Sequence, residues 1–214
     1  MEFHVLVREP AAEVREAGLL VLLHGYGADE KDLMGLSPAL DPSLRILSVR
    51  APHPTPMGGY AWFGIEFDTE IRSYDLDQAA SSLDDLVEFL SELRREVAGP
   101  MAIVGFSQGA MMAFAAVARQ PELAGSVALM SGKALDSLLP ADPPQGLDAV
   151  RFLIQHGTYD PLVPVENGRE LDALLTRWGV DHEYREYAMG HAVSAESLDD
   201  LARWLVGRLE VPTD

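Results

Sequence analysis

Short, mainly apolar segments recur along the chain, separated by glycine, proline or charged residues. Apolar runs of about five residues without alternation are typical of strands that are covered on both faces of a parallel sheet. Residues 3–8 have the pattern of an edge strand, and residues 183–187 alternate like a last strand. The buried strands predicted between them are residues 19–23, 45–49, 101–104, 126–130 and 151–155.

Helices are predicted between the strands, where apolar residues recur at helical spacing or the flanking residues favour helix ends. Pro164 suits a first helical position, Ser194 suits an N-cap, and Gly99 with Pro100 stops a helix. The predicted helices run from Asp29 toward Leu40 and over residues 75–97, 110–119, 164–178 and 194–209. This alternation predicts an α/β fold with a doubly wound, mostly parallel sheet and helices on both faces.

Composition narrows the class of protein. With 214 residues and 48% hydrophobic content, the chain is predicted to form one domain, residues 1–214, with a substantial core. The absence of cysteine excludes a disulfide scaffold, a thiolate metal site and a cysteine nucleophile. The formal charge of -18 argues against nucleic acid and against stable association with an anionic membrane.

The first residues contain no basic region followed by an apolar stretch, so we expect no signal peptide and a cytoplasmic location. No apolar run approaches the ~20 residues that a membrane-spanning helix needs.

Gly105, Ser107 and Gly109 form a Gly-x-Ser-x-Gly motif between a predicted strand and a predicted helix. This is the context of a nucleophile elbow, a strained turn that lifts the serine hydroxyl above the sheet. The glycines are required because side chains at these positions would collide with neighbouring backbone. We therefore predict that Ser107 is a nucleophile.

A serine hydroxyl needs a base within hydrogen-bond reach, and the base needs an anion that fixes its tautomer. His191 follows the last predicted strand and is the expected base. Asp160 follows the preceding strand and is the expected acid, with Asp136 as its rival. The order Ser107, Asp160, His191 is the α/β-hydrolase order of nucleophile, acid and base.

A tetrahedral oxyanion needs preorganised donors. The backbone N–H of Gln108, the residue after the nucleophile, is one candidate. The glycine-rich loop after residues 19–23 should supply the second, and we predict the backbone N–H of Tyr26. In the same loop, His24 has no accompanying pattern of metal ligands, which favours a structural hydrogen bond over a metal site.

Residues 51–63 are rich in proline, glycine and aromatic side chains, which predicts an irregular loop. Two interpretations of its aromatic residues are open. Trp62 and Phe63 could line the acyl pocket, which would make them substrate-binding residues. Alternatively, they could fasten the loop to the core.

The chain resembles the phospholipase/carboxylesterase family of small α/β-hydrolases, which includes bacterial carboxylesterases and acyl-protein thioesterases. The matching segments are residues 23–29, 105–110, 156–164 and 190–193. The resemblance implies an esterase without cofactor or metal, with a minimal lid or none. It implies the triad Ser107, Asp160 and His191, and an oxyanion hole from Tyr26 and Gln108. Leu162, in the third segment, is a further candidate for substrate binding.

Two departures from the family pattern bear on the substrate. Tyr26 stands where the family commonly has leucine, and Gly64 replaces the acid of a Trp-Tyr/Phe-Asp-Ile segment. We interpret the chain as a serine carboxylesterase for small to medium acyl esters, a class of small-molecule substrate. An acyl-protein thioesterase or lysophospholipase is the nearest alternative, and a catalytically silent binding module is an alternative of another class. Whether the chain forms a homodimer stays open.

Overall fold

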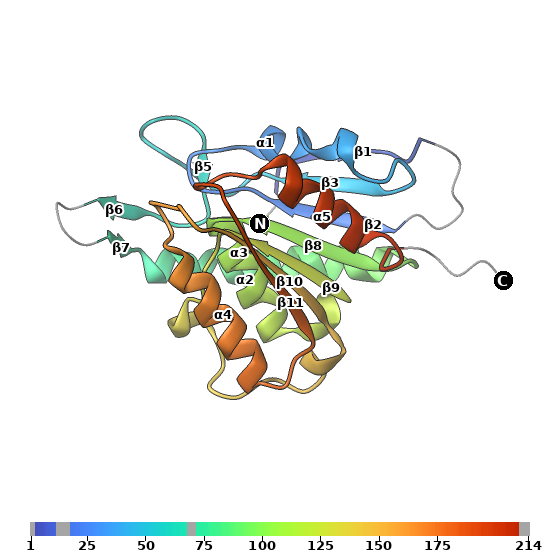
Figure 1. The fold of residues 1–214 in the computed structure, drawn as a ribbon. Coiled ribbons are helices and arrows are strands. Elements are labelled where there is room, and N and C mark those ends of the chain that lie inside the picture. Colours follow the sequence, from blue (N-terminus) through green and yellow to red (C-terminus); the bar gives the residue numbers. More distant parts are fainter. Residues whose placement is uncertain (1–2, 12–17, 68–71, 210–214) are drawn as a thin grey trace.

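A seven-stranded sheet forms the centre of the computed structural model, which describes residues 3–11, 18–67 and 72–209. The strand order is β1-β3-β2-β8-β9-β10-β11 (Figure 1). Only β1 runs antiparallel, against β3, while the other neighbours pair in parallel. The strands are β1 (Val5–Arg8), β2 (Leu19–Leu23), β3 (Arg45–Val49), β8 (Met101–Phe106), β9 (Ser126–Met130), β10 (Arg151–Gly157) and β11 (His182–Tyr187). The mostly parallel sheet that the apolar runs predict is confirmed.

Helices cover both faces of this sheet (Figure 1). On one face lie α2 (Leu76–Glu96), α3 (Gln108–Arg119) and α4 (Val165–Arg177). On the other lie α1 (Glu30–Met34) and α5 (Ala195–Leu205). Side chains alternate along each strand, so β2 sends Leu19, Val21 and Leu23 into the first core and Leu20 and Leu22 into the second. The continuous apolar runs therefore serve two cores at once.

Most helix ends agree with the sequence signals, but the last helix ends at Leu205 and not at Leu209 as predicted. Asp29 and Asp75 accept hydrogen bonds from backbone N–H groups of α1 and α2, and Ser194 forms a capping box with Ser197 at α5. The first helix is shorter than predicted. It ends at Met34 before Gly35, and a separate 3-10 turn follows. The 3-10 helices are Ser37–Ala39, Pro121–Leu123, Asp136–Leu138 and Leu147–Ala149.

One small hairpin replaces much of the irregular loop predicted at residues 51–63, and a second hairpin follows that loop. They pair β4 (His53–Pro54) with β5 (Tyr60–Ala61), and β6 (Ile65–Phe67) with β7 (Arg72–Tyr74). The first turn is possible because Gly58 and Gly59 have φ values of 94° and 74°, which residues with a Cβ rarely adopt. Proline and glycine signalled a break in regular structure, but they did not reveal this pairing.

The order of the strands places a topological switch point between β2 and β8. From β2 the chain moves outward to β3, and it later returns to the other side of β2 as β8. In open parallel sheets, ligands bind beyond the carboxyl ends of the strands at such a point. The His24 loop follows β2 and Ser107 follows β8, so both lie at the expected place.

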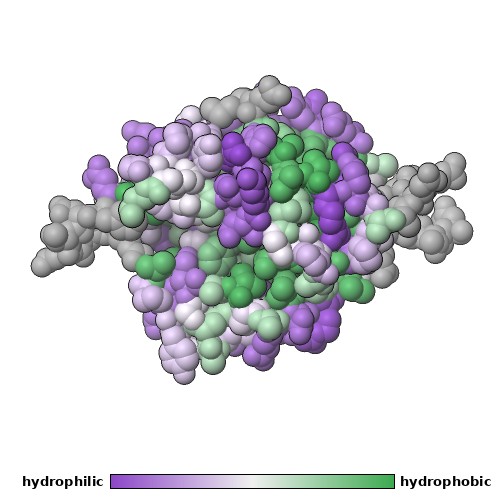
Figure 2. All heavy atoms as spheres, turned by 90° about the horizontal axis from the view of Figure 1, so that it is seen from above, coloured by the Kyte–Doolittle hydropathy of each residue, from purple (hydrophilic) through white to green (hydrophobic). Residues whose placement is uncertain are grey.

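The surface over α1 and α5 intersperses hydrophobic with hydrophilic residues (Figure 2). Within the described residues, the structure contains no helix that combines the length and apolarity needed to cross a bilayer.

Candidate active site

Ser107 occupies a strained turn between β8 and α3, with φ 55° and ψ −117°. Both flanking glycines are sterically required. A Cβ at Gly105 would lie 2.4 Å from the carbonyl oxygen of Gly109, and one at Gly109 would lie 2.0 Å from that of Leu23. The Ser107 N–H donates to the Met130 carbonyl at 2.8 Å, which ties the turn to the end of β9. The turn thus has the geometry of the predicted elbow.

Three side chains from three strand ends form a continuous chain of contacts. His191 Nε2 lies 2.9 Å from Ser107 Oγ, and His191 Nδ1 lies 2.7 Å from Asp160 Oδ2. The imidazole packs against the Phe106 ring, with centroids 4.9 Å apart. With Nδ1–H donated to the carboxylate, Nε2 can accept the serine proton.

Asp160 is fixed by its own loop. Its Oδ1 accepts the N–H groups of Leu162 at 2.9 Å and Val163 at 2.8 Å, and its side chain is fully buried. This leaves Oδ2 for His191. The rival acid, Asp136, lies exposed in a 3-10 helix, and its carboxylate does not line the cleft beside Ser107.

A buried histidine stands behind this acid. His156 Nε2 donates to the Val163 carbonyl at 2.8 Å and lies 3.7 Å from Asp160 Oδ2. Burial lowers the pKa of His156, so the ring is neutral at neutral pH. It holds the segment whose N–H groups bind Asp160.

The two residues predicted to supply the oxyanion donors lie at the cleft of the nucleophile. Gln108 is the first residue of α3, so its N–H belongs to the first turn, where no helical carbonyl accepts it. Tyr26 lies in the turn after β2, and both residues line the same cleft as Ser107. The structure therefore brings the predicted oxyanion residues and nucleophile together.

The cleft beside Ser107 has a volume of about 180 Å³. Leu162 lines it, as predicted, but Trp62 and Phe63 do not. Both aromatic side chains are fully buried, so the structure corrects the pocket interpretation in favour of the core interpretation. The residues that line the cleft are Gly25, Tyr26, Ala28, Asp32, Ile65, Tyr74, Phe106, Ser107, Gln108, Met111, Leu162, Val163 and His191.

Sequence reasoning did not predict most of this lining, and Ile65, Tyr74 and Met111 are among the residues that it missed. Met111 lies one helical turn after Ser107 and could have been found from that spacing. Ile65 and Tyr74 pair across the β6–β7 hairpin, for which the sequence offers no clear signal.

His24 braces the loop that carries Tyr26. Its Nε2 accepts the Ala51 N–H at 3.0 Å, which leaves Nδ1–H to donate to the Gly25 carbonyl at 2.7 Å. Burial lowers the pKa of His24, in keeping with a neutral ring. The prediction of a structural hydrogen bond is confirmed. The described residues contain no group of three or more His, Cys, Asp or Glu side chains that could hold a metal ion.

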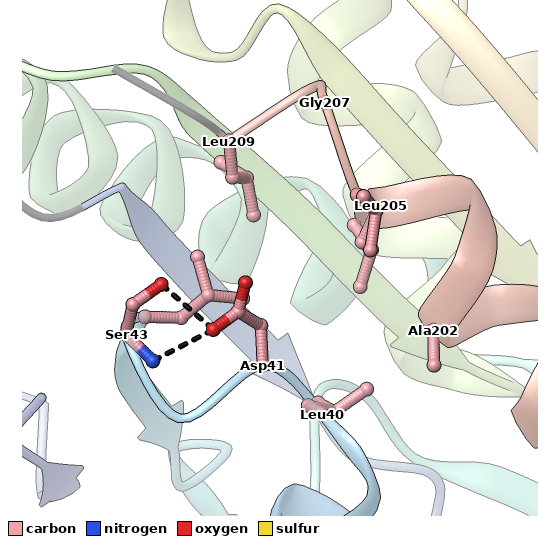
Figure 3. Close-up of a pocket in the computed structure, with 9 residues that line it drawn as sticks. Leu40, Asp41, Ser43, Ala202, Leu205, Gly207 and Leu209 are labelled. Atoms are coloured by element: carbon pink, nitrogen blue, oxygen red, sulfur yellow. Dashed lines mark hydrogen bonds between the residues drawn. The ribbon is translucent and has the colours of Figure 1, made fainter. Parts of the chain in front are cut away.

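A second cavity lies away from these strand ends, between α5 and the segment before β3 (Figure 3). Leu40, Leu205 and Leu209 point into it, and Asp41 accepts hydrogen bonds from the N–H and hydroxyl of Ser43. Its volume of about 20 Å³ is close to that of a single water and too small for an ester substrate.

Comparison with known proteins places this geometry in context. A model of the phospholipase/carboxylesterase family matches residues 6–207. The chain is 26% identical over 203 residues to esterase YpfH of Escherichia coli, covering 91% of this chain and 84% of that protein. It is 27% identical over 163 residues to acyl-protein thioesterase 1 of Kluyveromyces lactis, covering 71% and 70%. The crystal structure of esterase PE8 superposes with a TM-score of 0.80 at 28% identity, covering 96% and 98%.

Proposed function

The chain belongs to the phospholipase/carboxylesterase family, and we propose that it is a serine esterase that forms a covalent acyl-enzyme on Ser107. Its fold is that of an α/β-hydrolase, as the sequence predicts. The observation that carries the proposal is the Ser107–His191–Asp160 chain of contacts at 2.9 and 2.7 Å. Small to medium acyl esters are the proposed substrates.

In the acylation step, Ser107 Oγ attacks the ester carbonyl while His191 Nε2 takes the hydroxyl proton. Asp160 holds the imidazole in the required tautomer and stabilises its positive charge. The N–H groups of Tyr26 and Gln108 stabilise the oxyanion. The bond between the acyl carbon and the alcohol oxygen then breaks, and His191 returns the proton to the departing alcohol.

Deacylation repeats these steps with water. His191 takes a proton from the water, whose oxygen attacks the acyl carbon. The bond between Ser107 Oγ and the acyl carbon breaks, and the serine recovers its proton from His191. The products are the carboxylic acid and the free enzyme, so the cycle requires no cofactor.

The size of the cleft supports small to medium acyl groups. An apolar cavity of about 150 Å³ holds benzene, so a volume of about 180 Å³ suits roughly six to eight carbons. Ile65, Met111 and Leu162 supply an apolar lining, and each buried methylene contributes about 0.8 kcal/mol. Longer chains would extend into solvent and gain less per carbon.

An acyl-protein thioesterase is the second candidate, because several of the matched relatives carry that name. A chain-length series of aryl esters, run beside a lysophospholipid and a palmitoyl thioester, separates the two. We expect kcat/KM to rise with acyl length and level off near six to eight carbons. A preference for the palmitoyl thioester over every aryl ester would instead favour the thioesterase. No turnover of any of these substrates would favour a silent binding module.

A further inference from the structure

The side chain of Gln108 is buried and clamps a segment distant in the sequence. Its Oε1 accepts the Trp62 N–H at 2.9 Å, and its Nε2 donates to the Phe63 carbonyl at 2.7 Å. Both polar atoms of the amide are therefore satisfied by backbone of residues 62–63. The same residue supplies one proposed oxyanion donor through its own N–H, so this clamp ties one side of the oxyanion hole to residues 62–63.

The indole of Trp62 reaches the other side of the hole. Its Nε1–H donates to the His24 carbonyl at 2.9 Å, and His24 stands two residues before Tyr26. The Trp62 side chain is fully buried, and the Trp62 carbonyl accepts the Ser82 hydroxyl of α2 at 2.6 Å. Trp62 is thus anchored to the core while it holds the loop after β2.

The backbone of Tyr60 adds a second attachment to that loop. Gly27 N–H donates to the Tyr60 carbonyl, and Tyr60 N–H donates to the Ala28 carbonyl, both at 2.8 Å. Residues 60–63 therefore contact the loop before and after Tyr26 and the side chain of Gln108.

We propose that Trp62 is a positioning residue that fixes the spacing between the two backbone donors of the oxyanion hole. This inference rests on the proposed function and names a role for a side chain that does not line the cleft. Trp62 acts through His24 and Gln108 and touches no substrate. Its effect falls on the transition state, because the oxyanion forms only there, while the apolar cleft that binds the acyl chain stays intact.

Trp62→Phe removes the indole N–H and keeps an aromatic ring in the core. Trp204→Phe is the matched control, because Trp204 is also buried but packs on the opposite face of the sheet. Four quantities are measured for each folded variant with one aryl hexanoate as substrate: kcat, KM, and the inhibition constants of an aryl trifluoromethyl ketone and of hexanol. The ketone forms an oxyanion on the serine, so its inhibition constant measures directly how well the oxyanion hole stabilises that charge. Hexanol, as a competitive inhibitor, reports only the cleft.

We expect Trp62→Phe to lower kcat about 10- to 100-fold, because misplacing a reacting group by about 1 Å can cost 100-fold. The inhibition constant of the ketone should rise by a similar factor. KM and the hexanol constant should change less than about threefold, and Trp204→Phe should leave all four values near those of the parent. Purely structural damage would lower the thermal stability of both variants and would change the inhibition constants of the ketone and of hexanol by similar factors.

Two results would overturn the proposal. One is a folded Trp62→Phe enzyme whose kcat and ketone affinity stay within threefold of the parent. The other is a loss of kcat and ketone affinity in Trp204→Phe that equals the loss in Trp62→Phe. If Trp62→Phe does not fold, Gln108→Met decides by the same criteria, since it removes both side-chain hydrogen bonds and keeps the backbone donor. The proposed function is judged separately, by Ser107-dependent turnover of the parent.

Discussion

The two halves of the candidate site are held together in different ways. In the acid–base half, Asp160 is bound by N–H groups only two and three residues further along the chain. In the oxyanion half, Gln108 and Trp62 are 46 residues apart, and Trp62 and His24 are 38 residues apart. In the first half a local turn fixes the acid, and only His191 comes from a distant part of the chain, 31 residues from Asp160. In the second half, these contacts are all made by tertiary packing.

This difference predicts different failures. A change in the acid–base half removes a proton acceptor or misorients it, while the local turn stays folded. A change behind the oxyanion half shifts backbone donors through contacts that also stabilise the core. Chemistry and stability should therefore separate in the first half and be coupled in the second.

The largest effect is expected at the nucleophile that both halves share. Ser107→Ala should lower kcat by about 10⁶ while the fold stays intact, by analogy with other triads. Circular dichroism and thermal unfolding, run beside the assay, establish that the variant is folded. Activity within about tenfold of the parent would exclude Ser107 as the nucleophile.

In the acid–base half, Asp160→Asn should lower kcat by roughly 10⁴, because the amide favours the wrong imidazole tautomer. Asp136→Asn is the matched control for the rival acid and should leave kcat within about twofold. A greater loss of kcat in Asp136→Asn than in Asp160→Asn would mean that Asp136, and not Asp160, is the acid.

Each half contains one buried histidine whose pKa is lowered by burial, His24 in the oxyanion half and His156 in the acid–base half. In the unfolded chain these rings take up a proton near pH 6.5, whereas in the folded chain they resist it. Their stabilisation is therefore present above pH 6.5 and is lost as the pH falls toward the lowered values. Each ring contributes a slope of at most about 1.4 kcal/mol per pH unit.

Urea unfolding at pH 7.5, 6.5 and 5.5 measures this slope. Below pH 6.5, the unfolding free energy of His24→Gln and of His156→Gln should each fall less steeply with decreasing pH than that of the parent, whatever their unfolding free energy at pH 7.5. Slopes equal to that of the parent in both variants would contradict the assignment of neutral buried rings.

The smallest effect is expected for Tyr26→Leu in the oxyanion half. The proposed donor is the backbone N–H, so exchanging the side chain leaves it in place. We expect kcat to stay within about threefold and the preference among alcohol groups to shift, because Tyr26 lines the cleft. Competition assays with paired alcohol moieties measure this shift. A loss of 100-fold or more in kcat would mean that the phenol itself takes part in catalysis.

The sequence was most informative where a short segment determines its own geometry. The strands 19–23, 45–49 and 126–130 have the predicted bounds, because apolar runs signal strands buried on both faces. The elbow is specified by Gly105 and Gly109, and Asp160 shares one turn with the N–H groups that bind it. These features depend on residues close in the sequence.

The role of residues 60–63 could not be predicted in this way. Trp62 is aromatic and follows a proline- and glycine-rich stretch, which fits a pocket wall and a core anchor equally well. Which one it is depends on whether Gln108, His24 and Ser82 meet it, and they come from three separate elements. Ile65 and Tyr74 reach the cleft only through a hairpin that forms over the assembled core.

The central claim is that Ser107 is an activated nucleophile. Intact-protein mass spectrometry after treatment with an aryl alkylphosphonate tests it directly, with peptide mapping to locate the adduct. We predict one phosphonyl group per chain on Ser107 in the parent and none in Ser107→Ala. Asp160→Asn should be labelled much more slowly than the parent. A folded parent that takes up no phosphonyl group, or takes it up on another residue, would contradict the claim.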